Sequence, residues 1–128
     1  MKRPRILIVD DSSVMRKIAE RSLRQAGLEI GDVVEAGNGV EALAAVREAP
    51  FDLILSDINM PAMDGIEFLR QLGTLEGAKA TPVVMVATES SESRVVEALI
   101  IGAKGYIRRP FTLSQIKERV TPLLEVLG

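Results

Sequence analysis

Short hydrophobic runs recur along the chain, and each ends in polar or charged residues. The runs are rich in Val, Ile and Leu and are too short for helices. Continuous apolar runs of this kind are typical of strands buried on both faces, as in a parallel sheet. The pattern predicts strands at residues 5–9, 33–35, 52–56, 83–86 and 105–107.

Between these runs, hydrophobic residues recur at helical spacing. The first such stretch, residues 15–26, follows a possible capping serine (Ser12 or Ser13) and stops at Gly27. Pro122 lies inside the last stretch and should bend it, because proline cannot donate a backbone hydrogen bond. Four further helices are expected, at about 40–48, 65–72, 91–101 and 112–127.

The regular alternation of strand and helix predicts an α/β fold. Right-handed crossovers place five helices on the two faces of one five-stranded parallel sheet. The 128 residues are 47% hydrophobic and 27% charged, which suits a globular chain of one domain's length. Because no linker, repeat or low-complexity tract interrupts the pattern, we expect a single domain over residues 1–128.

The composition removes several kinds of chemistry. The chain has no His, Cys or Trp, which excludes disulfides, Ser-His-Asp and Cys-His catalysis, and metal sites built on His or Cys. The net charge is −2 and the aromatic residues are three Phe and one Tyr, so we expect no nucleic-acid partner. The basic start meets Asp10 and Asp11 too early for a signal peptide, and no stretch is long enough to span a membrane. A cytoplasmic protein without membrane insertion is expected.

Polar residues follow the predicted strands at the edge where ligands bind in open parallel sheets. Asp10 and Asp11 end the first strand, Asp57 follows the third, Thr88 follows the fourth, and Arg109 follows the fifth. Clustered carboxylates repel one another, and without His or Cys their natural counter-ion is a hard cation bound through oxygen, such as Mg²⁺. The alternative is that the aspartates only cap helices or shape turns.

Four motifs together resemble the bacterial response-regulator receiver domain, of the single-domain chemotaxis (CheY-like) type. The resemblance covers the whole chain and implies a flavodoxin-like, doubly wound sheet of strand order 2-1-3-4-5. The motifs are Ile-Val-Asp-Asp-Ser at 8–12, Ser-Asp-Ile-Asn-Met-Pro at 56–61, Met-Asp-Gly at 63–65 and Arg-Pro-Phe at 109–111.

The resemblance also implies roles for individual residues. Asp57 is the phosphoacceptor and takes a phosphoryl group from the phosphohistidine of a sensor histidine kinase. Mg²⁺ is bound directly by Asp11 and Asp57, through water by Asp10, and by the backbone carbonyl of Asn59. Such a chain assists its own phosphorylation and dephosphorylation but is not an enzyme in the usual sense. This metal site also suits phosphoryl transfer, which depends on positioning and charge neutralisation.

In this family a monomer signals to a downstream protein. The resemblance to the chemotaxis type suggests that this chain does so in chemotaxis. The implied docking face comprises the fourth helix, the fifth strand and the fifth helix. Candidate contact residues on that face are Arg94, Lys104, Tyr106 and Lys117.

Two positions depart from the family pattern. Ala87 stands where the family usually has Thr or Ser, and Thr88 comes one position later, where a strand side chain points to the opposite face unless a bulge intervenes. Arg109 replaces the usual Lys, which keeps the charge but presents a wide planar group. Arg109 is expected to pair with Asp57, or alternatively to point to solvent beside Arg108.

Three other functions remain open at this point. Ala87 suggests a pseudo-receiver, an interaction module that ignores phosphorylation. An aspartyl-phosphate phosphatase would use the same carboxylates and Mg²⁺, although such enzymes usually carry Asp-x-Asp after the first strand. Residues 37–42 read Gly-x-Gly-x-x-Ala, with Asp57 about twenty residues on, as in dinucleotide-binding domains, although Asn38 and Gly39 also suit an ordinary turn.

Overall fold

A parallel sheet of five strands forms the centre of the fold, in the order β2-β1-β3-β4-β5. The structure is a computed structural model and describes residues 3–125. The predicted α/β class and strand order are confirmed, and each strand lies within one residue of its expected bounds. The strands are β1 (Ile6–Val9), β2 (Val33–Ala36), β3 (Leu53–Asp57), β4 (Val83–Ala87) and β5 (Gly105–Arg108).

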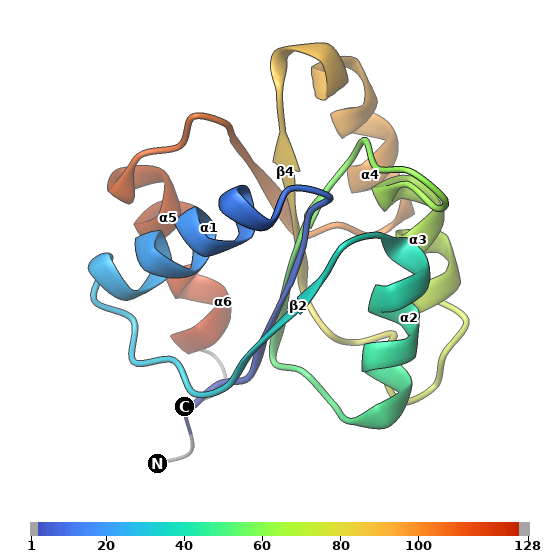
Figure 1. Ribbon diagram of the computed structural model, residues 1–128, viewed down its shortest axis with the longest axis horizontal. Coiled ribbons are helices and arrows are strands. Elements are labelled where there is room, and N and C mark those ends of the chain that lie inside the picture. The colour runs from blue at the N-terminus through green and yellow to red at the C-terminus, as the bar shows by residue number, and fades with distance from the viewer. Residues whose placement is uncertain (1–2, 126–128) are drawn as a thin grey trace.

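Helices cover both faces of the sheet (Figure 1). One face carries α1 (Ser13–Gln25), α5 (Leu113–Arg119) and α6 (Thr121–Glu125). The other carries α2 (Gly39–Glu48), α3 (Gly65–Leu72) and α4 (Val95–Ile101). Within residues 3–125, no helix combines the length and hydrophobicity needed to cross a lipid bilayer.

Alternate strand residues fill two separate cores, because successive side chains of a strand point to opposite faces of a sheet. In β1, Leu7 packs into the core under α2, α3 and α4, whereas Ile8 packs into the core under α1 and α5. Phe68 of α3 and Leu23 of α1 are fully buried in these respective cores. Both faces are therefore apolar, and the polar side chains are left for the strand ends.

Polar caps start the helices that follow the strands. The side chain at each cap accepts a hydrogen bond from the backbone N–H three residues later, which satisfies a donor that the helix cannot use. Ser12 is the cap of α1, which settles the choice between the two serines. The other caps are Asn38, Asp64 and Thr112, before α2, α3 and α5.

The fourth helical stretch is not one uniform helix from 91 to 101, as expected. A 3₁₀ segment, η1 (Glu89–Arg94), precedes α4. The hydroxyl of Ser91 accepts a hydrogen bond from the Thr88 N–H at 2.9 Å, and the two side chains form a reciprocal cap. Serine hydroxyls compete for backbone groups in this way, which favours a tight turn over a regular α-helix.

The last stretch is broken rather than bent. Pro122 has no N–H for the carbonyl one turn earlier, and the chain separates into α5 and α6 around Val120. The N–H groups of Leu123 and Leu124 both bond to the Val120 carbonyl, at 3.0 and 3.2 Å. The expected residues 126 and 127 of this helix lie outside the described residues.

Gly65 brings the start of α3 against the end of β3. Its N–H donates to the Ile58 carbonyl at 2.7 Å, and a Cβ at this position would overlap the carbonyl oxygen of Asp57. This obstacle is a backbone atom, so a side chain at 65 can be accommodated only if the loop after β3 moves.

We predict that Gly65→Ala lowers the free energy of unfolding by about 3 kcal/mol, because overpacking against backbone is costly. The matched control is Gly77→Ala, since an added Cβ there meets nothing within 4 Å. Urea denaturation should give a change within about 0.5 kcal/mol for the control. Equal stability of the two variants would show that the close approach at Gly65 is not maintained.

Candidate functional site

Three aspartates meet where β1 and β3 end. One carboxylate oxygen from each of Asp10, Asp11 and Asp57 lies within 4.8 Å of the others. Asp10 and Asp57 are each only 6% exposed, whereas Asp11 is exposed. The strand-end rule therefore brings the expected carboxylates together, two of them largely out of water.

Arg109 supplies the opposing charge. Its Nη2 lies 2.6 Å from Asp10 Oδ2 and 3.3 Å from Asp57 Oδ2. The guanidinium thus points into the site, while neighbouring Arg108 pairs with Glu92 at 3.5 Å. Arg109 Nε is buried and has no hydrogen-bond partner within residues 3–125. A buried donor of this kind is costly unless it is satisfied.

Burial and crowding alter the ionisation of the two buried aspartates. Burial, reinforced by the charge of Asp10, raises the pKa of Asp57 to about 6, although Arg109 and the Ile58 N–H favour its charged form. Burial also raises the pKa of Asp10, against the N–H of Ser12 and the guanidinium of Arg109. One guanidinium therefore does not offset the cost of burying these carboxylates.

The donor set fits a hard divalent cation. Every ligand atom in the cluster is a carboxylate oxygen, and Mg²⁺ prefers oxygen donors, with one or two carboxylates and several waters. Asn59 lies in the loop directly after β3, where its backbone carbonyl is the fourth predicted ligand.

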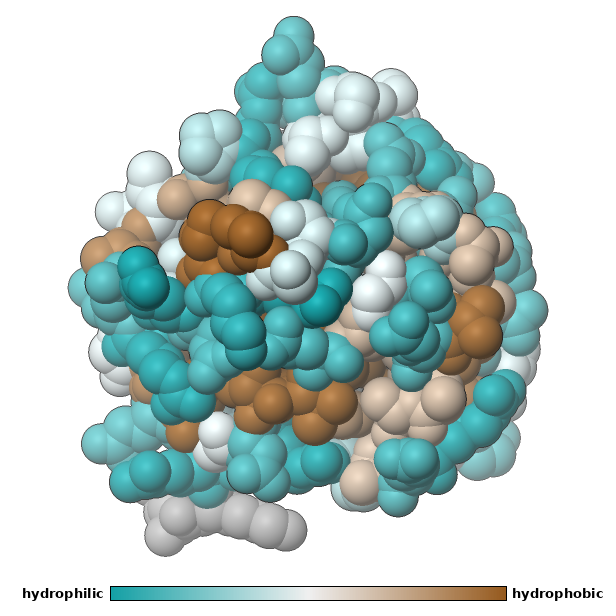
Figure 2. Space-filling view, viewed as in Figure 1, coloured by the Kyte–Doolittle hydropathy of each residue, from teal (hydrophilic) through white to brown (hydrophobic). Residues whose placement is uncertain are grey.

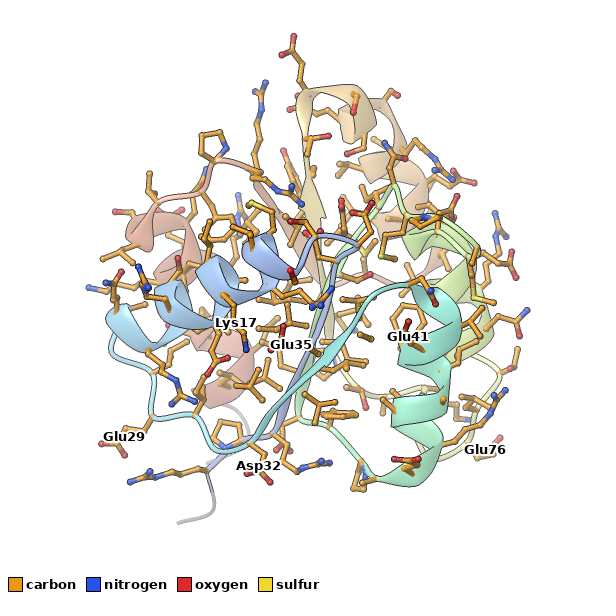
Figure 3. All side chains as sticks on the ribbon, viewed as in Figure 1. Lys17, Glu29, Asp32, Glu35, Glu41 and Glu76 are labelled. Carbon is orange, nitrogen blue, oxygen red and sulfur yellow. The ribbon has the colours of Figure 1, made fainter. Side chains whose placement is uncertain are left out.

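Arg16 fixes the backbone beneath the cluster, a role that sequence reasoning missed. Its Nη1 donates to the Asp10 carbonyl at 2.6 Å, and its Nε donates to Glu35 on β2 at 2.9 Å. Lys17 also reaches Glu35, at 2.6 Å, and its hydrogen bond lowers the pKa of that carboxyl (Figure 3). The signal in the sequence is only a basic pair one turn into α1.

Thr88 does not contact the cluster. Its hydroxyl lies 3.0 Å from Ser90 Oγ and 3.3 Å from Ser91 Oγ, within the cap of η1. The pairing of β4 with β5 is regular through Ala87 and Arg108, so no bulge within β4 turns Thr88 inward. Ala87 is fully buried under α4. Among the described residues, no hydrogen bond joins Thr88 to Asp57, and its role in the site stays a prediction.

Arg94 connects η1 with the loop after β3. Its Nη1 donates to Asn59 Oδ1 at 3.3 Å and to Asp64 Oδ2 at 3.1 Å. Although burial opposes it, the Glu67 N–H and the Arg94 guanidinium lower the pKa of Asp64. The sequence suggested a docking role for Arg94, but its guanidinium is engaged with the loop after β3.

The remaining docking candidates lie on β5 and α5 and directly before β5. Tyr106 of β5 is half-buried against the core under α4, and Lys104 and Lys117 are exposed. Between β5 and α5, a pocket of about 250 Å³ is lined partly by charged side chains, among them Arg108 and Glu118.

The glycine-rich turn before α2 has a structural explanation. Gly37 donates its N–H to Glu41 at 3.0 Å, Asn38 caps α2, and Gly39 donates to the Met63 carbonyl at 3.0 Å. A Cβ at Gly39 would come within 2.8 Å of that carbonyl. The turn thus serves capping and close packing, which accounts for its glycines without a dinucleotide.

Comparison with known proteins agrees with this geometry. The model of the response regulator receiver domain matches residues 6–121. The chain belongs to the response regulator receiver domain family. This receiver is 38% identical over 126 residues to chemotaxis protein CheY-3 of Vibrio cholerae serotype O1, covering 98% of this chain and 95% of that protein. It is 39% identical over 121 residues to chemotaxis protein CheY of Pseudomonas aeruginosa, covering 94% and 96%.

The fold of this receiver also matches a solved relative. The chemotaxis response regulator CheY4 of Vibrio cholerae superposes with a TM-score of 0.82 at 34% identity, covering 95% of this chain and 99% of that one. The predicted family and its CheY-like type are confirmed. Membership of the family implies two-component signalling, with histidine kinases and downstream proteins as partners and an acidic pocket that binds Mg²⁺.

The raised pKa of Asp57 predicts a pH-dependent stability for this receiver. Between pH values of about 4 and 6, the folded protein retains a proton on Asp57 that the unfolded chain has released, so stability falls as pH rises. Asp57→Asn removes the cost of ionising this buried carboxyl in the folded state. It should stabilise the metal-free protein by about 1–3 kcal/mol at pH 7. The gain should shrink towards zero near pH 3.5.

Urea denaturation in a chelating buffer at several pH values measures this difference. Asp32→Asn is the control, because it removes one negative charge from a side chain that is 82% exposed. A gain for Asp57→Asn that is constant with pH, or equalled by the control, would contradict the argument.

Proposed function

We propose that this receiver accepts a phosphoryl group on Asp57 from the phosphohistidine of a sensor kinase and passes the signal to a protein partner. The observation that carries the proposal is the placement of a buried Asp57 between two other carboxylates and an inward-pointing Arg109. Few structural roles require so much charge in one buried place, whereas phosphoryl transfer depends on it.

The carboxylate of Asp57 is oriented for attack. Its Oδ1 accepts a hydrogen bond from the Ile58 N–H at 2.8 Å, and its Oδ2 faces Arg109. A carboxylate oxygen bonds to phosphorus, the phosphorus–nitrogen bond breaks, and its electron pair returns to the imidazole of the donor. Arg109 Nη2, which faces Asp57 Oδ2, can then donate a hydrogen bond to a phosphoryl oxygen.

Four residues are the proposed ligands of Mg²⁺. Asp11 and Asp57 would bind Mg²⁺ directly, Asp10 would bind it through a water molecule, and Asn59 would contribute its backbone carbonyl. When bound, the ion would supply positive charge near the phosphoryl oxygens. The all-oxygen cluster supports this assignment. Burial raises the pKa values of Asp10 and Asp57 by disfavouring their charged forms, and a bound cation would offset that cost.

The kinase would approach at the strand ends, beside the first turns of α1. There Val14 is 65% exposed and Ile18 is 42% exposed, and Figure 2 shows a hydrophobic patch over α1. For output, we propose the face of α4, β5 and α5. A single domain over residues 1–128, a monomeric state, a cytoplasmic location and a role in chemotaxis stay predictions.

Phosphorylation is tested with acetyl phosphate and Mg²⁺. We expect intact mass spectrometry to show one added phosphoryl group, which Asp57→Asn and removal of Mg²⁺ each abolish. The rate should fall at acidic pH, because the nucleophile is the ionised carboxylate. Asp52→Asn is the matched control, since Asp52 lies at the opposite end of β3 and bonds to the Arg5 N–H. Unchanged labelling of Asp57→Asn would contradict the proposal.

A pseudo-receiver is the second candidate, and the burial of Ala87 is the observation that favours it. With a methyl group at 87 and the Thr88 hydroxyl engaged by Ser90 and Ser91, the end of β4 offers no hydroxyl to a phosphoryl group. Partner capture with Asp57→Ala distinguishes the candidates. Capture that depends on acetyl phosphate in the unaltered protein and is lost in the variant supports the phosphoacceptor, whereas equal capture supports the pseudo-receiver.

A further inference from the structure

We infer that Arg94 is a positioning residue that couples the acceptor loop, residues 58–65, to η1 and α4. The inference rests on the proposed function and deepens it, because it names the side chain through which phosphorylation of Asp57 would reach the output face. Arg94 achieves this by holding Asn59 and Asp64 at once.

The first step is the position of Arg94 in the chain. It is the last residue of η1 and directly precedes Val95, the first residue of α4. A displacement of its guanidinium is therefore expected to move the N-terminal end of α4. Val95 is buried in the same core as Ala87 and Ile58, so this end of α4 is packed against the ends of β3 and β4.

The second step is the position of its two partners. Asn59 is two residues beyond Asp57, and Asp64 is the cap of α3. The two ends of the acceptor loop are also joined by the backbone hydrogen bond from Gly65 to Ile58 at 2.7 Å. Arg94 thus binds a loop that begins directly after the acceptor and whose two ends are joined by a hydrogen bond.

The third step is that the two carboxylate oxygens of Asp64 have different partners. Its Oδ1 accepts the Glu67 N–H at 3.0 Å and caps α3, while its Oδ2 accepts Arg94 at 3.1 Å. The carboxylate is therefore shared between helix α3 and the segment before α4. A change in the position of this loop alters both contacts together.

The fourth step is the shortage of other polar connections. Among residues 3–125, no side-chain hydrogen bond links Ala87 or Thr88 with the acceptor, and the Thr88 hydroxyl is engaged within η1. In this part of the chain, the side-chain hydrogen bonds between η1 and the acceptor loop are those of Arg94. Polar coupling between the two loops therefore depends on its guanidinium.

The fifth step is electrostatic. A phosphoryl group replaces a single negative charge with one approaching −2, so the loop becomes more attractive to a cation at its rim. The Arg94 and Asp64 side chains are 35% and 31% exposed, so solvent screens the attraction between them only in part. Because the attraction differs between the two states of Asp57, Arg94 can shift the equilibrium of η1, as any coupling between sites requires.

The test uses beryllofluoride with Mg²⁺ as a phosphoryl mimic and follows backbone amide shifts by NMR. In the unaltered protein we expect shifts both near Asp57 and along α4. In Arg94→Ala the shifts near Asp57 should persist, while those at residues 95–101 should fall several-fold. Asp64→Asn should have the same effect, since an Asn still caps α3 but removes the charge partner. Arg94→Lys, which keeps the charge, should restore part of the α4 response.

Arg70→Ala is the matched control. Arg70 pairs with Glu97 at 3.1 Å and also joins the α3 region to α4, but it does not touch the acceptor loop. It should leave the α4 response unchanged. An undiminished α4 response in Arg94→Ala, an equal loss in Arg70→Ala, or an α4 that never responds in the unaltered protein would each overturn the role of Arg94. If amides near Asp57 fail to respond in the unaltered protein, the proposed function fails and this inference falls with it.

Discussion

The attraction between the Arg109 guanidinium and the carboxylates of Asp10 and Asp57 makes the rest of the site possible. Two like charges about 4 Å apart near a protein surface repel each other by roughly 4 kcal/mol. Burial adds to that cost, because it takes the charged groups out of water. Arg109 contacts both carboxylates with one nitrogen, which offsets part of this cost and lets them lie close together.

The sheet is what makes this arrangement reproducible. Every strand is parallel, so all carboxyl ends meet at one edge, and the apolar faces leave no other place for buried charge. Around that edge the scaffold is held by backbone atoms. Arg16 binds the Asp10 carbonyl, and Gly65 allows α3 to begin against the Asp57 carbonyl. The site is therefore positioned by main-chain contacts as much as by its own side chains.

Much of this could be predicted from sequence because it depends on local patterns. Apolar runs indicated the strands, and the strand-end rule brought Asp10, Asp11 and Asp57 together. The strand order came from the family resemblance, since periodicity says nothing about which strands are neighbours. The 3₁₀ segment was missed because the bond between Thr88 and Ser91 outweighs the helical pattern there.

The contacts of Arg94 were also beyond prediction. Its partners Asn59 and Asp64 are 35 and 30 residues away in sequence, and the reach of a long side chain across loops has no periodic signature. The inward orientation of Arg109 was left open against a solvent-facing alternative for the same reason. At Pro122 the sequence correctly located a break in helical regularity but predicted only a bend. In the structure the helix is interrupted there, between α5 and α6.

The half-buried position of Tyr106 has a practical consequence. The chain has no Trp and this is its single Tyr, so intrinsic ultraviolet emission at tyrosine wavelengths arises from β5 alone. The ring lies against the core that also holds Ala87 and Val95, at the border between the strand ends and α4. Unlabelled protein therefore carries its own optical probe at one defined place, on the side of the sheet where the two loops meet the output helix.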